Sequence, residues 1–414
     1  MDPVRLLLIS STAVLSLMLL IEWNQYSDEY QKQQSDLYSA AIAEPLMLGD
    51  ETAGTPLSGG LDEGIPSVNQ EASPLAVFLD DSQTFTLSTD TLNLVISADG
   101  GDVVSASLPK FPVRLDAPDQ PFRLLENNSL RRYVAQSGLI GPDGIDASGN
   151  RARYASQGLT NNGDGSHTLT LAWTGNDPLG LQVYKRFSAY DDRYDVDVSF
   201  DIRNGGRSVA SITSFAQLKR DNTQAPDGNT GFGVSPYLGA ALTQPDERYT
   251  KLSFSDLGDG PFSKRLPAGW VAILQHYFVS AWIPSQQTSH DYFASQLSNG
   301  DNVIGYKNQN VDIAPGSATT ITQTLYVGPK DQVVLADLAK YLDLVIDYGW
   351  LWWLAKPLFL LLTLIQQFVI NWGLAIIALT VIVKLVFFRL SAASYKSMAK
   401  MRTVLPKIQS IKDQ

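Results

Sequence analysis

The sequence predicts a membrane-anchored protein with a large all-β domain, and three observations support this fold class. An apolar run, Leu6–Ile21, follows Arg5 near the N-terminus. Short segments in which apolar and polar residues alternate recur from Leu75 to Gly328, a pattern typical of antiparallel strands. A second apolar region, Leu351–Leu390, leads into a basic C-terminal segment. The β domain therefore lies between two membrane-associated regions.

The charge of the chain is unevenly distributed. The 414 residues carry a net charge of -11 and include no cysteine. The lack of cysteine excludes disulfides, thiolate metal sites and cysteine nucleophiles, and the acidic balance argues against nucleic acid as a partner. Basic residues nevertheless gather at the C-terminal end, and the same segment contains one acidic residue, Asp413. The basic residues are Lys384, Arg389, Lys396, Lys400, Arg402, Lys407 and Lys412. Such asymmetry suits a chain whose ends lie in different environments.

The N-terminal apolar run predicts an uncleaved anchor. A cleavable signal peptide needs small residues directly after its apolar core, but Glu22, Trp23 and Tyr26 follow here. The nearest A-x-A pattern, Ala41–Ala43, lies too far downstream. We expect residues 1–27 to form a transmembrane anchor with its aromatic residues at the interface. A cleaved signal is the alternative.

The second apolar region is about twice as long as one span requires. It breaks at Asn371, and tryptophans with Lys356 cluster at the start of its first half. The positive-inside rule places the basic C-terminal segment in the cytoplasm, which a single return span achieves and two would not. We therefore expect an interfacial amphipathic helix over 351–370 and a transmembrane helix over 371–393. The alternative, in which 351–369 also spans, stays open.

The remaining segments follow from composition and periodicity. Residues 28–74, rich in Gln, Ser, Gly, Pro and acids, read as a flexible linker. Residues 75–330 predict an antiparallel sandwich, since their alternating runs are separated by Gly/Asn/Asp turns. Residues 331–350 carry apolar residues at helical spacing and predict a connecting helix. The clearest predicted strands are Thr84–Ser88, Leu92–Ile96, His167–Leu171, Tyr194–Phe200 and Thr320–Val327.

No catalytic pattern appears in the predicted sandwich. The three histidines form no metal or nucleophile motif. We expect His276 to be a satisfied, partly buried side chain and His290 to lie in a polar loop. A glycan-binding sandwich would need exposed aromatics such as Trp270, Trp282 and Tyr277, but their apolar setting favours a core position. We therefore predict no enzyme, no catalytic residue, no cofactor and no metal site.

Four segments resemble a known family, and the resemblance covers the chain almost end to end. They are GWVAILQHYFVSAWIP at Gly269–Pro284, LYVGPK at Leu325–Lys330, YLDLVIDYGWLW at Tyr341–Trp352, and the block Asn371–Lys412 that begins NWGLAIIALTVIVKLVFFRL. On these segments the chain resembles the bacterial members of the YidC/Oxa/Alb family of membrane protein insertases.

The resemblance implies a fold, a location and partners. The implied fold is a periplasmic β-supersandwich, similar to sugar-mutarotase folds, on a multi-pass protein of the bacterial inner membrane. The implied function is insertion and folding of nascent membrane proteins, alone or with the Sec translocon, through a hydrophilic groove. Membrane lipids and, on the cytoplasmic side, the ribosome are further implied partners; nucleic acid is not. The family continues past the position of Gln414, so 394–414 would begin a cytoplasmic helical hairpin.

Lys384 is the candidate substrate-groove residue. A charge inside an apolar span is costly and by default marks a functional site. The resemblance places Lys384 at the family's positive groove residue, usually arginine; lysine keeps the charge but lacks the planar fork of donors. One alternative is that Lys384 snorkels towards the headgroups. Another is that the chain is a bitopic receptor with a periplasmic sensor domain, which would have the same topology.

Overall fold

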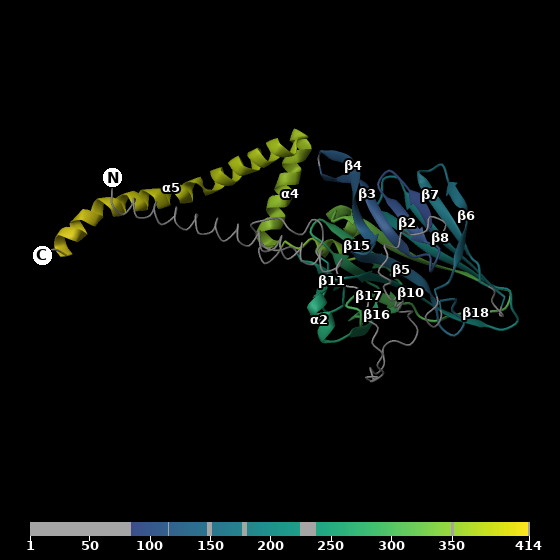
Figure 1. The fold of residues 1–414 in the computed structure, drawn as a ribbon. Helices are drawn as coiled ribbons and strands as arrows, with labels where there is room; N and C mark the ends of the chain where they lie inside the picture. Colours follow the sequence, from purple (N-terminus) through teal and green to yellow (C-terminus); the bar gives the residue numbers. More distant parts are fainter. Residues whose placement is uncertain are drawn as a thin grey trace, which may run out of the picture. The chain divides into compact units, whose positions relative to one another are not determined.

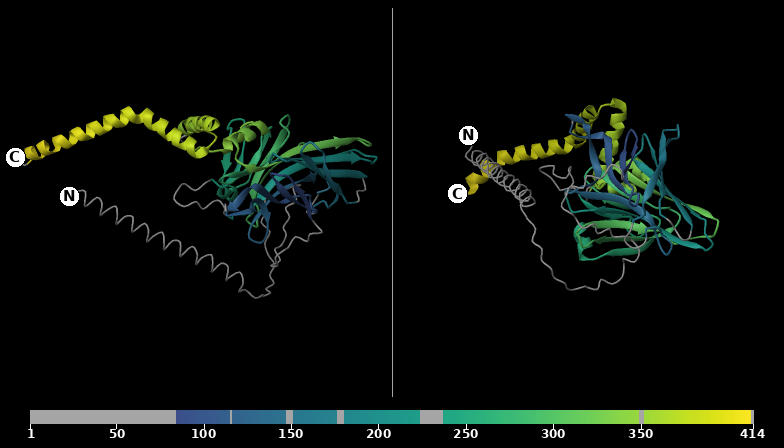
Figure 2. Two further views of the ribbon diagram at one scale, coloured as in Figure 1. Left: turned by 90° about the horizontal axis from the view of Figure 1, so that it is seen from above. Right: turned by 45° about the vertical axis from the view of Figure 1, so that its right-hand side comes forward.

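The computed structural model describes residues 84–114, 116–146, 151–175, 180–223, 237–348 and 352–412, and two antiparallel sheets form its core (Figure 1). The predicted anchor, 1–27, and linker, 28–74, lie outside the described residues. The all-β sandwich is confirmed, and its two layers can be followed in the further views of Figure 2.

Each sheet joins strands that are distant in sequence. The first is 10-stranded, in the order β1-β2-β3-β4-β5-β10-β17-β16-β13 with β18 paired to β10; the second is 9-stranded, in the order β12-β11-β14-β15-β19-β9-β8-β7-β6. The strands of the first sheet are β1 (Thr84–Ser88), β2 (Asn93–Ser97), β3 (Val103–Arg114), β4 (Ala117–Asn127), β5 (Arg132–Ile140), β10 (Ala210–Arg220), β13 (Phe262–Pro267), β16 (Ser289–Gln296), β17 (Asn302–Lys307) and β18 (Val311–Ile313). Those of the second are β6 (Tyr154–Asn161), β7 (Ser166–Trp173), β8 (Leu181–Tyr190), β9 (Asp195–Asn204), β11 (Gly239–Leu242), β12 (Thr250–Leu252), β14 (Val271–Leu274), β15 (Phe278–Ile283) and β19 (Ala318–Pro329). A short helix, α2 (Phe254–Asp259), links β12 to β13.

Period-two alternation explains the strands that were predicted. Along β8, every second residue from Leu181 to Ala189 is buried, while the residues between them are exposed or half-buried. Side chains of successive residues point to opposite faces, so such a strand has one face on the core and one in water. Each of the five clearest predicted strands falls within or overlaps an observed one.

β14 and β15 are buried on both faces, which explains their continuous apolar sequence. Every residue of both strands is buried. Their inner face contributes Val271, Ile273 and Trp282 to the sandwich core, and their outer face is covered by the connecting segment after β19. A strand covered on both faces reads as an apolar run rather than an alternation.

The connecting segment, predicted as one helix over 331–350, consists of two short helices in the structure. These are α3 (Gln332–Leu338) and a 3-10 helix, η2 (Leu342–Val345). Tyr341, with φ 68°, breaks the helix between them. Next to this break, the Trp270 indole N–H donates to the Lys340 carbonyl at 3.2 Å. This hydrogen bond ties the connecting segment to the sandwich. Both helices still bury their apolar residues against β11, β14 and β15.

Candidate functional site

Two helices follow the connecting segment, and a defined break separates them. They are α4 (Trp352–Val369) and α5 (Trp372–Lys412). Ile370, with φ 58°, ends the first. The Asn371 side-chain oxygen then accepts the Leu374 N–H at 3.1 Å and caps the second helix. Asparagine is a preferred N-cap because it satisfies an N–H with no partner in the helix.

α5 contains the stretch that can cross a membrane. Trp372–Arg389 is the one helical stretch in the described part of the chain that is long and apolar enough to do so by length and composition. The apolar part of α4, Trp353–Val369, is shorter. This difference favours the interfacial placement of α4, which stays a prediction.

One face of α5 packs on α4. The two helices are in contact, and Ala375 is completely buried, while Ala378, Leu379 and Val383 are half-buried. These positions lie on one side of a helix with 3.6 residues per turn. This side anchors α5 to α4.

Lys384 lies on the opposite face of α5. At about 100° per residue, it is rotated by about 180° from Ala375. The same line of the helix carries small or polar exposed residues: Gly373, Thr380, Lys384, Ser391 and Tyr395. The Thr380 hydroxyl donates to the Ile376 carbonyl at 2.8 Å, so its polar group is satisfied within the helix. No described residue pairs with the Lys384 ammonium, which leaves it available to a partner.

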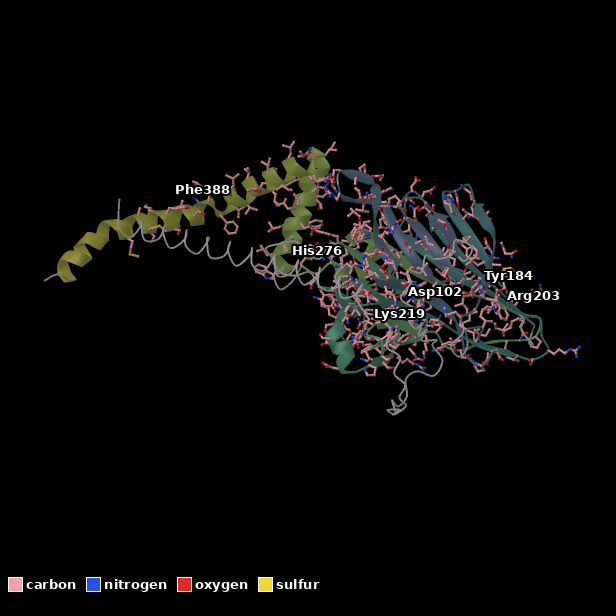
Figure 3. All side chains as sticks on the ribbon, viewed as in Figure 1. Asp102, Tyr184, Arg203, Lys219, His276 and Phe388 are labelled. Atoms are coloured by element: carbon pink, nitrogen blue, oxygen red, sulfur yellow. The ribbon has the colours of Figure 1, made fainter. Side chains whose placement is uncertain are left out.

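Exposed apolar residues lie beside this line and, at Ile377, on it. Ile377, Leu385 and Phe388 are more than half exposed, and Figure 3 labels Phe388 on α5. A cation between exposed apolar side chains requires contact with water, headgroups or a partner charge. We refer to Gly373, Thr380, Lys384, Ser391 and Tyr395 as the Lys384 face.

The histidines of the sandwich offer no comparable site. His276 is partly buried, as predicted, and stacks on Tyr277 with ring centroids 3.9 Å apart. The prediction that its polar atoms are satisfied is wrong for Nδ1, which is buried without a hydrogen bond. The polar-loop prediction for His290 is wrong. His290 is buried in β16 with Nε2 2.8 Å from the Ser285 carbonyl, because it shares the buried alternation of Tyr292 and Ala294.

The described residues of the sandwich form neither an exposed aromatic cluster from the three predicted candidates nor a metal site. Trp270 and Trp282 are buried, as the sequence predicted. Of the three candidates, Tyr277 is the exposed one. Among the described residues, no three His, Asp or Glu side chains are placed to hold a metal ion. The exposed aromatic cluster that a glycan-binding surface would use is therefore not formed by these residues.

Comparison with known proteins decides the family. Residues 84–361 match the model of the YidC periplasmic domain, and residues 364–414 match that of the 60Kd inner membrane protein. Membrane protein insertase YidC of Marinomonas sp. (strain MWYL1) is 41% identical over 423 residues, covering 100% of this chain and 74% of that protein. The same-named protein of Pseudomonas entomophila (strain L48) is 40% identical over 423 residues, with the same coverage.

The chain belongs to the YidC family of membrane protein insertases. Its relatives are named as insertases rather than as catalysts of a covalent reaction, in agreement with the prediction that the chain is not an enzyme. Among solved structures, a galactose mutarotase related enzyme from Lactobacillus acidophilus covers 59% of the chain at 12% identity and a TM-score of 0.41. A galactose mutarotase-like protein from Lactobacillus casei covers 59% of the chain at 8% identity and a TM-score of 0.39. At these scores the likeness carries no argument about sugar chemistry.

Sequence reasoning missed a buried ionic network inside the YidC sandwich. Lys185 of β8 is completely buried and donates to the carbonyls of Gly100, Gly101 and Ser137 at 2.8–2.9 Å. Burial lowers the pKa of Lys185 to about 7. The alternation of β8 contained the signal that was missed: Lys185 occupies one of the positions whose side chains point into the core.

Arg151 completes this network. Its guanidinium pairs with Asp102, labelled in Figure 3, and with Asp146 at 3.0 Å. Lys185 comes from the second sheet, whereas Ser137 lies in the first. The network therefore fastens the two sheets together. Paired buried charges of this kind are costly to separate, which indicates a structural role.

Proposed function

We propose that the chain inserts nascent membrane proteins into the bacterial inner membrane, and that Lys384 contacts their polar or acidic segments. One observation carries this proposal: an exposed ammonium with no described partner, within the apolar stretch Trp372–Arg389 that is able to span the membrane. Family membership supplies the activity, because the relatives are named membrane protein insertases.

The physical task explains why a cation is useful there. A polar segment that enters hydrocarbon loses its water, and unsatisfied or charged groups cost several kcal/mol each. A hydrophilic groove along the Lys384 face would shorten the apolar path. The ammonium would offset the charge of a passing carboxylate without forming or breaking bonds.

The proposal includes a topology. Residues 1–27 would form an N-terminal transmembrane anchor with its start in the cytoplasm, and 28–74 a linker to the periplasmic sandwich, 75–330. After the connector, 331–350, residues 351–370 would lie on the periplasmic membrane surface and 371–393 would return through the bilayer. Residues 394–414 would begin a cytoplasmic hairpin, in a multi-pass protein. The Sec translocon, the ribosome and membrane lipids are the proposed partners besides the nascent chain.

Substitutions of Lys384 test the proposed role of its charge. In the full-length protein, Lys384→Arg should retain insertion, whereas Lys384→Ala and Lys384→Glu should impair it. The loss should be about 5- to 30-fold for clients with acidic translocated segments, equivalent to about 1–2 kcal/mol, and smaller for neutral ones. The measurement is protease protection of a radiolabelled client in inverted membrane vesicles.

Arg389→Ala is the matched control. Arg389 ends the apolar stretch of α5, where a long side chain reaches the headgroups, so its removal should change insertion little. A stably expressed Lys384→Ala variant that inserts acidic clients normally would support snorkelling and remove Lys384 from the site.

A further inference from the structure

The sandwich has one edge strand that is poorly protected against pairing. At the ends of the two sheets lie β1, β13, β12 and β6. β13 carries Lys264, Arg265 and Pro267, β12 has 3 residues and β1 has 5. β6 has 8 residues, YASQGLTN, with neither a charge nor a proline. Natural edge strands are usually blunted by charge, proline, short length or a bulge; β6 lacks the first two, is the longest of the four, and has a bulge only in its first half.

Among the described residues, none bonds to the outer side of the backbone along the second half of β6. At its start, the Tyr154 N–H donates to the Ala98 carbonyl at 2.8 Å, and a bulge interrupts pairing between Ser156 and Gly158. The Asn162 N–H donates to the Ser166 carbonyl at 3.0 Å, on the β7 side. In an antiparallel ladder alternate residues face the partner, so Leu159 and Asn161 direct their N–H and C=O groups to the open side.

The apolar face of the second sheet also ends openly at β6. Leu159 is directly opposite Leu169 of β7, and opposite residues share a face. Leu169 is buried in the core, yet Leu159 is 53% exposed. A strand added beside β6 would bond the free backbone groups and cover the Leu159 side chain.

We propose that the β6 edge binds an extended periplasmic segment of a client membrane protein by strand addition. This inference rests on the proposed insertase function, which delivers unfolded segments with unpaired backbone groups to the same compartment. The absence of charge on β6 selects neutral segments, with an apolar residue at the position beside Leu159. A second copy of the chain fits less well, because a symmetric pair of β6 strands would bring two bulges into one ladder.

Cysteine crosslinking in the full-length protein tests the proposal; residues 1–414 contain no cysteine, and any cysteine outside them is first replaced by serine. The probe is a ribosome-stalled client with one cysteine in a neutral, alternating periplasmic segment. Leu159→Cys should form a disulfide with this client at least about fivefold more than Val209→Cys. Val209 is the matched control, since it is also 53% exposed but lies outside the strands.

A client variant separates strand addition from chance proximity. Prolines at alternate positions of the client segment remove N–H donors, so crosslinking at Leu159→Cys should fall to the level of the control. Equal crosslinking at both sites, no loss with proline, or a predominant Leu159→Cys homodimer would each overturn the proposal. Client insertion is measured in parallel. Normal insertion without the crosslink refutes strand addition alone, whereas failed insertion by the unmodified protein refutes the proposed function.

Discussion

Two lysines in this chain occupy opposite extremes of environment. Lys384 is exposed on an apolar helix, and its position could be predicted because a charge interrupts an apolar run. Lys185 is buried among three carbonyls, and composition gives little warning of it. Its network depends on Asp102, Asp146 and Arg151, which pairing between distant strands brings together, and no local pattern encodes that encounter.

Lys185 should make the stability of the sandwich depend on pH. Its pKa is about 7 when folded and about 10.4 in an unfolded chain. Between these values the unfolded chain binds the extra proton, so this group should raise the free energy of unfolding as pH rises from 7 to 10. The slope for one proton is at most about 1.4 kcal/mol per pH unit, and below pH 7 the contribution is flat.

The measurement is urea unfolding of the detergent-solubilised protein, followed by tryptophan fluorescence, for the parent and a Lys185→Met variant. Because tyrosines also titrate at high pH, the informative quantity is the difference between the two proteins. If the two curves keep the same slope from pH 7 to 10, Lys185 is not the titrating group.

At the scale of elements, a strand could be predicted from the sequence when one of its two faces is exposed to water. Strands with one wet face, such as β8, showed their period in the sequence. β14 and β15 did not, because the connecting segment covers their outer face. The break of that segment at Tyr341 was missed for a related reason: it lies beside a carbonyl that accepts a hydrogen bond from Trp270, 70 residues away, and no local pattern shows that contact.

Topology at α4 and α5 can be tested with single cysteines. If α4 lies on the periplasmic surface and α5 returns through the bilayer, Val209→Cys should react with an impermeant maleimide in spheroplasts and Met398→Cys should not. Both side chains are 53% exposed, so accessibility within the protein does not bias the comparison. Labelling of Met398→Cys in intact spheroplasts would mean that α4 also spans.

At the scale of the molecule, the sandwich is an all-or-none unit. A cut at Pro267 would leave β16, β17 and β18 of the first sheet, and β14 and β19 of the second, without their earlier partners. The apolar faces of α3 and η2 would also lose part of their support, since β11 would be gone. The domain boundary therefore matters more than the number of residues removed.

Complete removal of the sandwich should preserve most insertion activity, because Lys384 lies outside it and client binding at β6 would only assist insertion. Replacing 84–348 by a flexible linker in the full-length protein should leave client insertion within about threefold of normal. A deletion ending at Pro267 should instead aggregate or be degraded, because it exposes core strands. Loss of insertion by a well-expressed complete replacement would show that the domain is essential.

The pairing of β9 with β19 also sets the timing of biogenesis. β9 ends at Asn204, yet its neighbour β19 is complete only at Pro329, so that edge stays unpaired while more than a hundred further residues are synthesised and exported. Contacts between such distant segments form slowly, because loop closure must precede them. The hydrophobic helices α4 and α5 emerge from the ribosome after β19 and the short connecting segment that contains α3 and η2. In the proposed topology, maturation of the exported domain and integration of α5 into the bilayer would therefore fall within the same short interval of translation.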